Sequence, residues 1–161
     1  MRRCATLLVA ATSLLAVIAF IATAPAASAE SAPIRTATTD RAYVDRMLFG
    51  VGMATFLAAV GVDRWFDWST DLCSAPLIGS TGRSFDFRHP CRRHHFGYRN
   101  LKLIDRRYGT RHWGSTSRKA VDDRFRTDMH DHCRVRSTWL RPTCHCWAEV
   151  FYVAVRAAGG P

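Results

Sequence analysis

The sequence predicts an all-helical domain, small and held together by disulfide bonds. Apolar residues recur at helical spacing in four segments after residue 39, whereas alternating strand patterns are poor. Five cysteines follow an N-terminal export signal, and small exported chains commonly use disulfides to supplement a modest core. The length of 161 residues suits one domain.

The first segment, residues 1–29, has the composition of a signal peptide. It has a positive start, an almost wholly apolar stretch over residues 7–24, and a small-residue cleavage site at Ala27-Ser28-Ala29. A transmembrane anchor is the alternative, because the apolar stretch is nearly long enough to span a bilayer. Pro25 and the cleavage site favour a cleaved signal, so we expect a secreted, extracellular protein that starts near Glu30.

The chain is strongly basic, with 23 Lys and Arg against 13 Asp and Glu and a net charge of +10. Without the two arginines of the signal, 21 basic residues against 13 acidic ones leave +8. This excess suits an anionic partner, either a lipid surface or nucleic acid, or it serves solubility alone. Because the recognised nucleic-acid-binding motifs are missing from the sequence, we expect no nucleic acid partner.

The first expected helix begins at Asp40, where the proposed domain of residues 40–161 starts. Before it, residues 30–39 are polar and contain proline, and we expect them to form a mobile leader. Gly50 and Gly52 weaken this helix. Its apolar residues recur at roughly helical spacing: Tyr43, Met47, Leu48, Val51 and Phe56.

An irregular stretch separates this helix from the second one. Residues 65–73 are aromatic, and residues 74–90 are rich in glycine and proline, which indicates a surface loop. The second expected helix runs from Cys91 to about Arg107. One of its faces carries three residues at helical spacing: His94, Tyr98 and Leu101.

Two more helices complete the predicted bundle. Gly109 and Gly114 mark a connection, after which Ser115 or Ser117 can cap the third helix. Pro142 interrupts the pattern before the last helix. One face of the third helix carries Asp122, Phe125, Met129 and Cys133. The apolar stripe of the last helix consists of Ala148, Phe151, Tyr152 and Val155.

His94 and Asp122 each lie on the apolar side of an expected helix. If the two helices pack antiparallel, the carboxylate can meet the imidazole, fix its tautomer and stabilise its protonated form. The other ring nitrogen can then take a proton from water. Spacing alone leaves a second interpretation open, in which His94 is a hydrogen-bonded core residue.

Two long motifs resemble those of the bacterial and fungal secreted phospholipases A2, in the same order along the chain. Residues 66–73 (FDWSTDLC) look like the calcium-binding segment of that family. Residues 91–100 (CRRHHFGYRN) resemble its catalytic-helix motif, Cys-x-x-His-Asp-x-Gly-Tyr-Arg-Asn. Residues 121–125 (VDDRF) are similar to the segment that bears its catalytic aspartate. The likeness covers roughly residues 63–158.

The resemblance implies the fold and the mechanism of a phospholipase A2. His94 would be the general base that activates water, and Asp122 would orient it. Calcium, bound through the Asp71 carboxylate and the Leu72 backbone carbonyl, would polarise the sn-2 ester of a glycerophospholipid. The products would be a fatty acid and a lysophospholipid.

One position of the catalytic-helix motif departs from the family pattern. Where the family has an aspartate as a second calcium ligand, this chain has His95, and imidazole is a poor calcium ligand without negative charge. Asp67 and Asp86 are near in sequence, but nothing in the sequence brings them to the metal. Three outcomes stay open: weak calcium binding at Asp71, Leu72 and His95, a different metal, or loss of catalysis with the fold retained.

The departure leaves two functional alternatives beside the hydrolase. The first is a catalytically silent, lipid-binding relative, such as a toxin or an effector. The second is a non-enzymatic binding protein that disulfides or a metal hold together.

The same resemblance implies two disulfide bonds. Cys73 would pair with Cys91, and Cys133 would pair with Cys144, which leaves Cys146 as the odd cysteine. A zinc cluster is the competing interpretation, although an oxidising environment favours disulfides. It would draw on six closely spaced residues: His130, His132, Cys133, Cys144, His145 and Cys146.

Basic and aromatic residues accumulate around the proposed site in the sequence, a combination that suits the headgroup level of a membrane. The basic ones are Arg88, Arg92, Arg93, Arg99, Lys102, Arg106, Arg107, Arg111, Arg118 and Lys119. The aromatic ones are Trp65, Trp68 and Trp113. An ordinary solvated face is the alternative. We expect a monomer that acts at a phospholipid membrane or micelle surface, preferably an anionic one.

Overall fold

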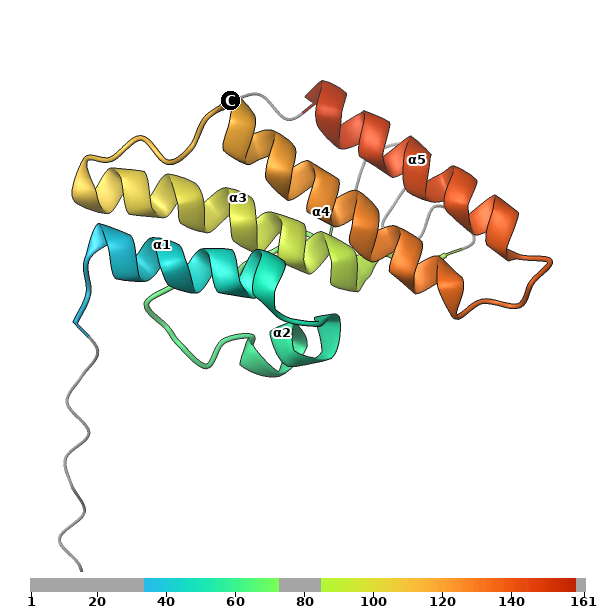
Figure 1. Cartoon of the computed structure of the whole chain (residues 1–161), viewed down its shortest axis with the longest axis horizontal. Coiled ribbons are helices and arrows are strands. Elements are labelled where there is room, and N and C mark those ends of the chain that lie inside the picture. Colours follow the sequence, from blue (N-terminus) through green and yellow to red (C-terminus); the bar gives the residue numbers. More distant parts are fainter. Residues whose placement is uncertain (1–33, 73–84, 159–161) are drawn as a thin grey trace, which may run out of the picture. The chain divides into compact units, whose positions relative to one another are not determined.

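The described residues of the computed structural model, 34–72 and 85–158, form helices and connections without a strand, as the sequence predicts. Figure 1 shows the elements in order: α1 (Ala37–Asp45), a π-helical turn η1 (Arg46–Gly50), α2 (Met53–Ala59), α3 (Arg88–Tyr108), α4 (Ser115–Arg134) and α5 (Arg141–Ala158). The expected signal peptide and the first part of the expected leader lie outside the described residues.

The first helix starts earlier than its apolar pattern indicates. Thr36 caps it, because the Thr36 hydroxyl accepts from the Thr39 amide at 3.1 Å and the Thr39 hydroxyl accepts from the Thr36 amide at 2.9 Å. This reciprocal capping box satisfies two amides that would otherwise lack partners. Helix α1 therefore begins at Ala37 rather than at Asp40, and residues 36–39, expected in the leader, form its cap and first turn.

The two glycines of the first helical segment interrupt it. Helix α1 runs into the wider turn η1, which ends at Gly50, and Val51 is extended at φ −125° and ψ 152°. Gly52 then precedes α2. The single expected helix is thus two helices with a break between them, and the break lets α2 turn its Phe56 into the core.

The three long helices lie close to their predicted places. Helix α3 starts at Arg88, three residues before Cys91, and ends at Gly109, whose φ of +66° suits a residue without Cβ. At the start of α4 the Ser117 hydroxyl accepts from the Gly114 amide at 2.9 Å, so Gly114 precedes the helix. Pro142 stands in the first turn of α5, where a missing N–H costs little.

Helix α3 packs against both α1 and α4, and α4 packs against α5 (Figure 1). Two groups of buried side chains fill these contacts. The first group joins α1, η1 and α2 to α3 and includes Val44, Leu48, Phe56, Phe96 and Ile104. The second group joins α3, α4 and α5 and includes Phe87, Phe125, Met129, Ala148 and Phe151. This packing places His94 of α3 beside Asp122 of α4.

A disulfide joins the end of α4 to the start of α5, as expected. Cys133 and Cys144 are bonded, with their Cα atoms 5.6 Å apart. Since both thiols are used, the six-residue zinc cluster is wrong, and no group of three or more His, Cys, Asp or Glu residues in the described part of the chain suits a metal. Cys146 is exposed and free.

The other predicted disulfide is described at one end only. Cys91 is disulfide-bonded, but its expected partner Cys73 lies outside the described residues, so this pairing stays a prediction. Among the helices of the described ranges, none combines the length and the apolar character needed to cross a membrane.

Candidate active site

His94 and Asp122 meet between the antiparallel helices α3 and α4. The His94 Nε2 atom lies 2.7 Å from Asp122 Oδ1. His94 is 5% exposed and Asp122 is fully buried. Because a carboxylate can only accept, this contact requires the proton of the neutral ring at Nε2. The contact therefore leaves the lone pair of the ring on Nδ1.

The second ring nitrogen of His94, Nδ1, is the one with a lone pair available to accept a proton. Its Nδ1 atom is buried and has no hydrogen-bond partner among the described residues. The ring is held in place by Tyr98 and Phe125, whose ring centroids lie 4.4 and 4.9 Å away. A buried polar nitrogen without a partner is costly to keep, which points to a group that completes it during function.

Asp122 of α4 accepts hydrogen bonds from donors on the two neighbouring helices, α3 and α5. Its Oδ1 also accepts from the Tyr98 hydroxyl at 2.7 Å, and its Oδ2 accepts from Arg156 Nη1 at 2.8 Å. Burial alone would raise the pKa of Asp122, but hydrogen bonds from His94, Tyr98 and Arg156 outweigh it and leave the pKa below its ordinary value. Asp122 is therefore a carboxylate at neutral pH.

Arg118 connects this cluster to the end of α5. Its Nη2 donates to the carbonyl oxygens of Arg156 at 2.6 Å and Val155 at 3.3 Å, and its Nε donates to the Tyr98 hydroxyl at 3.3 Å. Burial, and then the bond to Asp122, raise the pKa of Tyr98 to about 12, so its hydroxyl remains a donor.

Sequence reasoning placed Tyr98 on the correct face but missed its role, together with those of Arg118 and Arg156. The spacing of four residues from His94 to Tyr98 was the available signal. For Arg156 there was none, because it reaches Asp122 from a helix 34 residues further along the chain.

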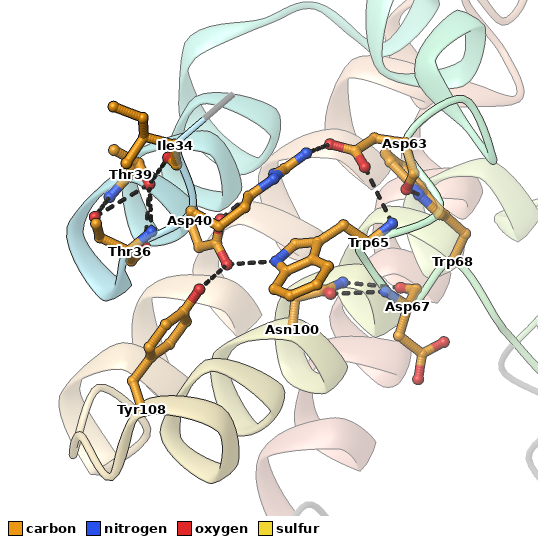
Figure 2. A network of polar contacts seen from close by, with 11 residues as sticks. Ile34, Thr36, Thr39, Asp40, Asp63, Trp65, Asp67, Trp68, Asn100 and Tyr108 are labelled. Carbon is orange, nitrogen blue, oxygen red and sulfur yellow. Dashed lines mark hydrogen bonds and ion pairs between the residues drawn. The ribbon is translucent and has the colours of Figure 1, made fainter. Parts of the chain in front are cut away.

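Asn100 fastens the segment before the loop to α3. Its side-chain oxygen accepts from the Asp67 amide at 2.8 Å, and its Nδ2 donates to the Asp67 carbonyl at 2.8 Å (Figure 2). Asn100 is fully buried, so these two hydrogen bonds to the backbone replace the water that would otherwise solvate the side-chain amide. It explains physically why an asparagine ends the catalytic-helix motif.

Asp40 ties the same segment to α1. Figure 2 shows its carboxylate accepting from the Trp65 indole at 2.5 Å and from the Tyr108 hydroxyl at 3.0 Å. Arg35 contacts Asp40 at 3.4 Å and Asp63 at 2.7 Å. These contacts hold residues 63–67 in one position relative to α3.

The expected calcium ligands lie together but do not form a calcium-binding set. His95 Nδ1 lies 3.2 Å from Asp71 Oδ1 and 2.9 Å from the Thr70 hydroxyl. The imidazole therefore contacts the carboxylate that was expected to bind calcium. Leu72 has a φ of +60°, a conformation that side chains other than glycine adopt at a cost. Burial lowers the pKa of His95, which keeps the ring neutral.

Other carboxylates do not replace the missing ligand in the described part of the chain. Asp67 accepts from the Ser69 amide at 2.9 Å, and Asp86 pairs with Arg88 at 2.5 Å. Calcium takes six to eight oxygen ligands, whereas one carboxylate, one backbone carbonyl and one imidazole are offered here. The described residues therefore do not fit a tight calcium site.

The expected basic surface around the site needs correction at Arg93. Its guanidinium is fully buried, donates to the carbonyl oxygens of Leu48 and Val51 at 3.3 and 3.2 Å, and lies 3.5 Å from Asp128. It therefore joins η1 to α3 and α4 instead of facing a lipid.

The expected aromatic residues are also engaged within the fold. Trp68 stacks on Phe96 at 4.4 Å between ring centroids, and Trp113 packs edge-on against Tyr98 at 4.5 Å. The indole of Trp65 is bound to Asp40.

Comparisons with known proteins agree with the motifs. The family model of prokaryotic phospholipase A2 matches residues 44–159. The chain is similar to a secretory phospholipase A2 of Arthroderma benhamiae, with 36% identity over 137 residues that cover 81% of this chain and 87% of the relative. It is also similar to a secretory phospholipase A2 of Beauveria bassiana, with 36% identity over 118 residues, 72% of this chain and 57% of the relative. The chain therefore belongs to the prokaryotic phospholipase A2 family.

Proposed function

We propose that this protein is a secreted phospholipase A2 that hydrolyses the sn-2 acyl ester of glycerophospholipids, with His94 as general base and Asp122 as its partner. Family membership supports the reaction class. The observation that carries the assignment of residues is the 2.7 Å contact from His94 Nε2 to Asp122, which leaves the buried Nδ1 without a partner.

The proposed reaction begins at His94 Nδ1. This atom takes a proton from a water molecule, whose oxygen attacks the sn-2 carbonyl carbon of the lipid. The tetrahedral intermediate then collapses, the bond to the glycerol oxygen breaks, and the imidazolium returns its proton to that oxygen. A free fatty acid and a lysophospholipid leave the site.

Asp122 has two tasks in this scheme. It holds the proton at Nε2, so that Nδ1 presents its lone pair, and its negative charge stabilises the imidazolium that forms. Tyr98 and Arg156 keep this carboxylate ionised and oriented, and neither needs to touch the substrate.

A catalytically silent lipid-binding relative is the second candidate. One observation favours it, namely His95 beside Asp71 in place of a second carboxylate. Such a protein would keep the fold and the partner, a phospholipid membrane or micelle surface, and would act as a monomer without releasing fatty acid.

Vesicles of a phosphatidylcholine with different acyl chains at sn-1 and sn-2 separate the two candidates. We expect the mature protein to release the sn-2 fatty acid in calcium-containing buffer. The amount released in the presence of a chelator measures how far the reaction depends on calcium. Mass spectrometry of the products identifies the chain that is lost. Vesicle binding without fatty-acid release in either buffer would contradict the enzyme and favour the silent relative.

A further inference from the structure

Beyond Arg141, the most exposed residues of α5 carry no charge, whereas the partly exposed Glu149 and Arg156 are paired with Arg126 and Asp122 of α4. Its exposed residues beyond Arg141 are Pro142, Thr143, Cys146, Val150, Val153, Ala157 and Ala158. The other side of the helix packs on α4 through Cys144, Ala148 and Phe151. Helix α5, which packs on α4 (Figure 1), is therefore apolar on the side that faces α4 and largely apolar at its most exposed positions.

The outward residues of α5 form one stripe, and Trp139 lies in the turn just before the helix. Trp139 is 77% exposed, Val150 43% and Val153 62%. Steps of three or four residues keep side chains on one face of a helix. On α5 this stripe is about 21 Å long at 1.5 Å per residue and consists of Thr143, Cys146, Val150, Val153 and Ala157.

Cationic residues stand beside the Trp139 end of this stripe. Arg134 and Arg141 are exposed, Arg136 is half-buried, and Val135 between them is 83% exposed. Single exposed apolar residues are ordinary, but an uncharged stripe of this length in a chain with a net charge of +10 marks a surface that something covers.

Two kinds of occupant have the required apolar character: a second copy of the chain and a lipid surface. The net charge makes two copies repel each other, whereas it attracts an anionic membrane. A tryptophan at one end of the stripe with arginines around it matches the boundary between headgroups and acyl chains. The charge and the stripe therefore favour lipid over a second copy.

We propose that the outer stripe of α5 is the membrane-contact surface of this protein, with α5 lying in the plane of an anionic phospholipid interface. This rests on the proposed function in one respect, since the same lipid supplies the substrate. The last turn of α5 also carries Arg156, which binds the Asp122 carboxylate at 2.8 Å. The helix that docks on the membrane thus contacts the Asp122 carboxylate of the proposed catalytic pair.

A charge placed in the stripe provides the first test. Vesicles are made from ether-linked analogues of phosphatidylcholine and phosphatidylglycerol, which contain no carboxylic ester, so that binding is measured apart from hydrolysis. We expect Val150→Asp and Val153→Asp each to weaken cosedimentation with anionic vesicles by about tenfold or more, because the new charge must stay in water. The matched control is Val62→Asp, at a valine that is 75% exposed outside the stripe, and it should bind like the wild type.

A probe on the unaltered surface provides the second test. Cys146 is exposed and free, so a polarity-sensitive fluorophore can be attached to it. Its emission should shift to shorter wavelength when anionic vesicles are added, whereas the same label on Val62→Cys in a Cys146→Ser background should not shift. This readout does not depend on whether the aspartate variants fold.

Three outcomes would overturn the proposal. They are aspartate variants that bind like the wild type, a Cys146 probe that stays in water while the protein binds, or a wild-type dimer in analytical ultracentrifugation that the aspartate variants dissociate. Absence of hydrolysis on ester lipids would instead count against the enzyme and leave the stripe as a lipid-binding surface.

Discussion

Asp122 shows how neighbours decide the charge of a buried residue. It is fully buried, yet it accepts hydrogen bonds from donors on α3 and α5, so the carboxylate stays ionised where burial alone would favour the neutral acid. The same donors fix its two oxygens, one toward His94 and one toward Arg156. In the proposed mechanism, catalysis thus depends on residues that do not touch the substrate.

Asp122→Asn should reveal this charge as a dependence of stability on pH. The pKa of Asp122 is lower in the folded protein than its ordinary value of 3.8, so its stabilisation is complete above that value and is lost as pH falls through the lower folded-state pKa. Urea unfolding should show the variant less stable by about 3–5 kcal/mol at pH 6, and the gap should narrow below pH ~4. A gap that stays constant down to pH ~3 would mean that folding does not lower the pKa of Asp122.

His95 is the residue at which the chain leaves its family's pattern. Its imidazole contacts Asp71 and Thr70, where a second carboxylate would offer oxygen to calcium. The substitution changes the donor set without touching the His94–Asp122 pair.

His95→Asp should tighten calcium binding by about tenfold or more, because it adds a hard anionic ligand beside Asp71. Calorimetric titration of both proteins at one pH measures this. His112→Asp is the control, since it adds the same charge outside the site. Equal calcium affinity in His95→Asp and the wild type would show that position 95 does not face the metal.

At the scale of elements, the catalytic-helix motif is a packing motif as much as a chemical one. Asn100 anchors the Asp67 backbone, Cys91 is disulfide-bonded, and Gly97 lets α3 approach its neighbours. A Cβ on Gly97 would come within 2.8 Å of Val121 on α4 and 2.9 Å of Leu48 on η1. These residues set the distance at which His94 meets Asp122.

Gly97→Ala should therefore lower the free energy of unfolding by about 1–3 kcal/mol, as overpacking of a tight core does. Gly52→Ala is the matched control, because a Cβ there meets nothing within 4 Å; we expect it to change stability by no more than about 1 kcal/mol. Thermal unfolding of both variants makes the comparison. Equal effects would contradict close packing at Gly97.

For the whole molecule, periodicity and motifs predicted the helices, the His94–Asp122 contact and the Cys133–Cys144 disulfide. They could not predict the break at Val51 or the early start at Ala37, because a local cap and two glycines decide these and apolar spacing does not report them. The prediction that Arg93 lies on the basic surface was wrong for a similar reason. Its burial depends on Asp128 and on backbone carbonyl groups from distant segments.

The contacts of the candidate site could likewise be predicted from the sequence only where they lie within one motif. Residues within one motif, such as His94 and Tyr98, could be placed together from their spacing, whereas the approach of Arg156 depends on how α5 packs against α4. The long-range polar contacts of the catalytic pair are a product of the assembled fold.

The most direct measurement of the central claim is fatty-acid release from phospholipid vesicles by His94→Gln, compared with the wild type and with His112→Gln. His94→Gln removes the basic nitrogen and keeps a polar side chain of similar size, and circular dichroism checks that each variant is folded. We predict that His94→Gln loses about 10²–10⁴-fold in rate, while His112→Gln keeps the wild-type rate. A folded His94→Gln protein that releases fatty acid as fast as the wild type would contradict the account.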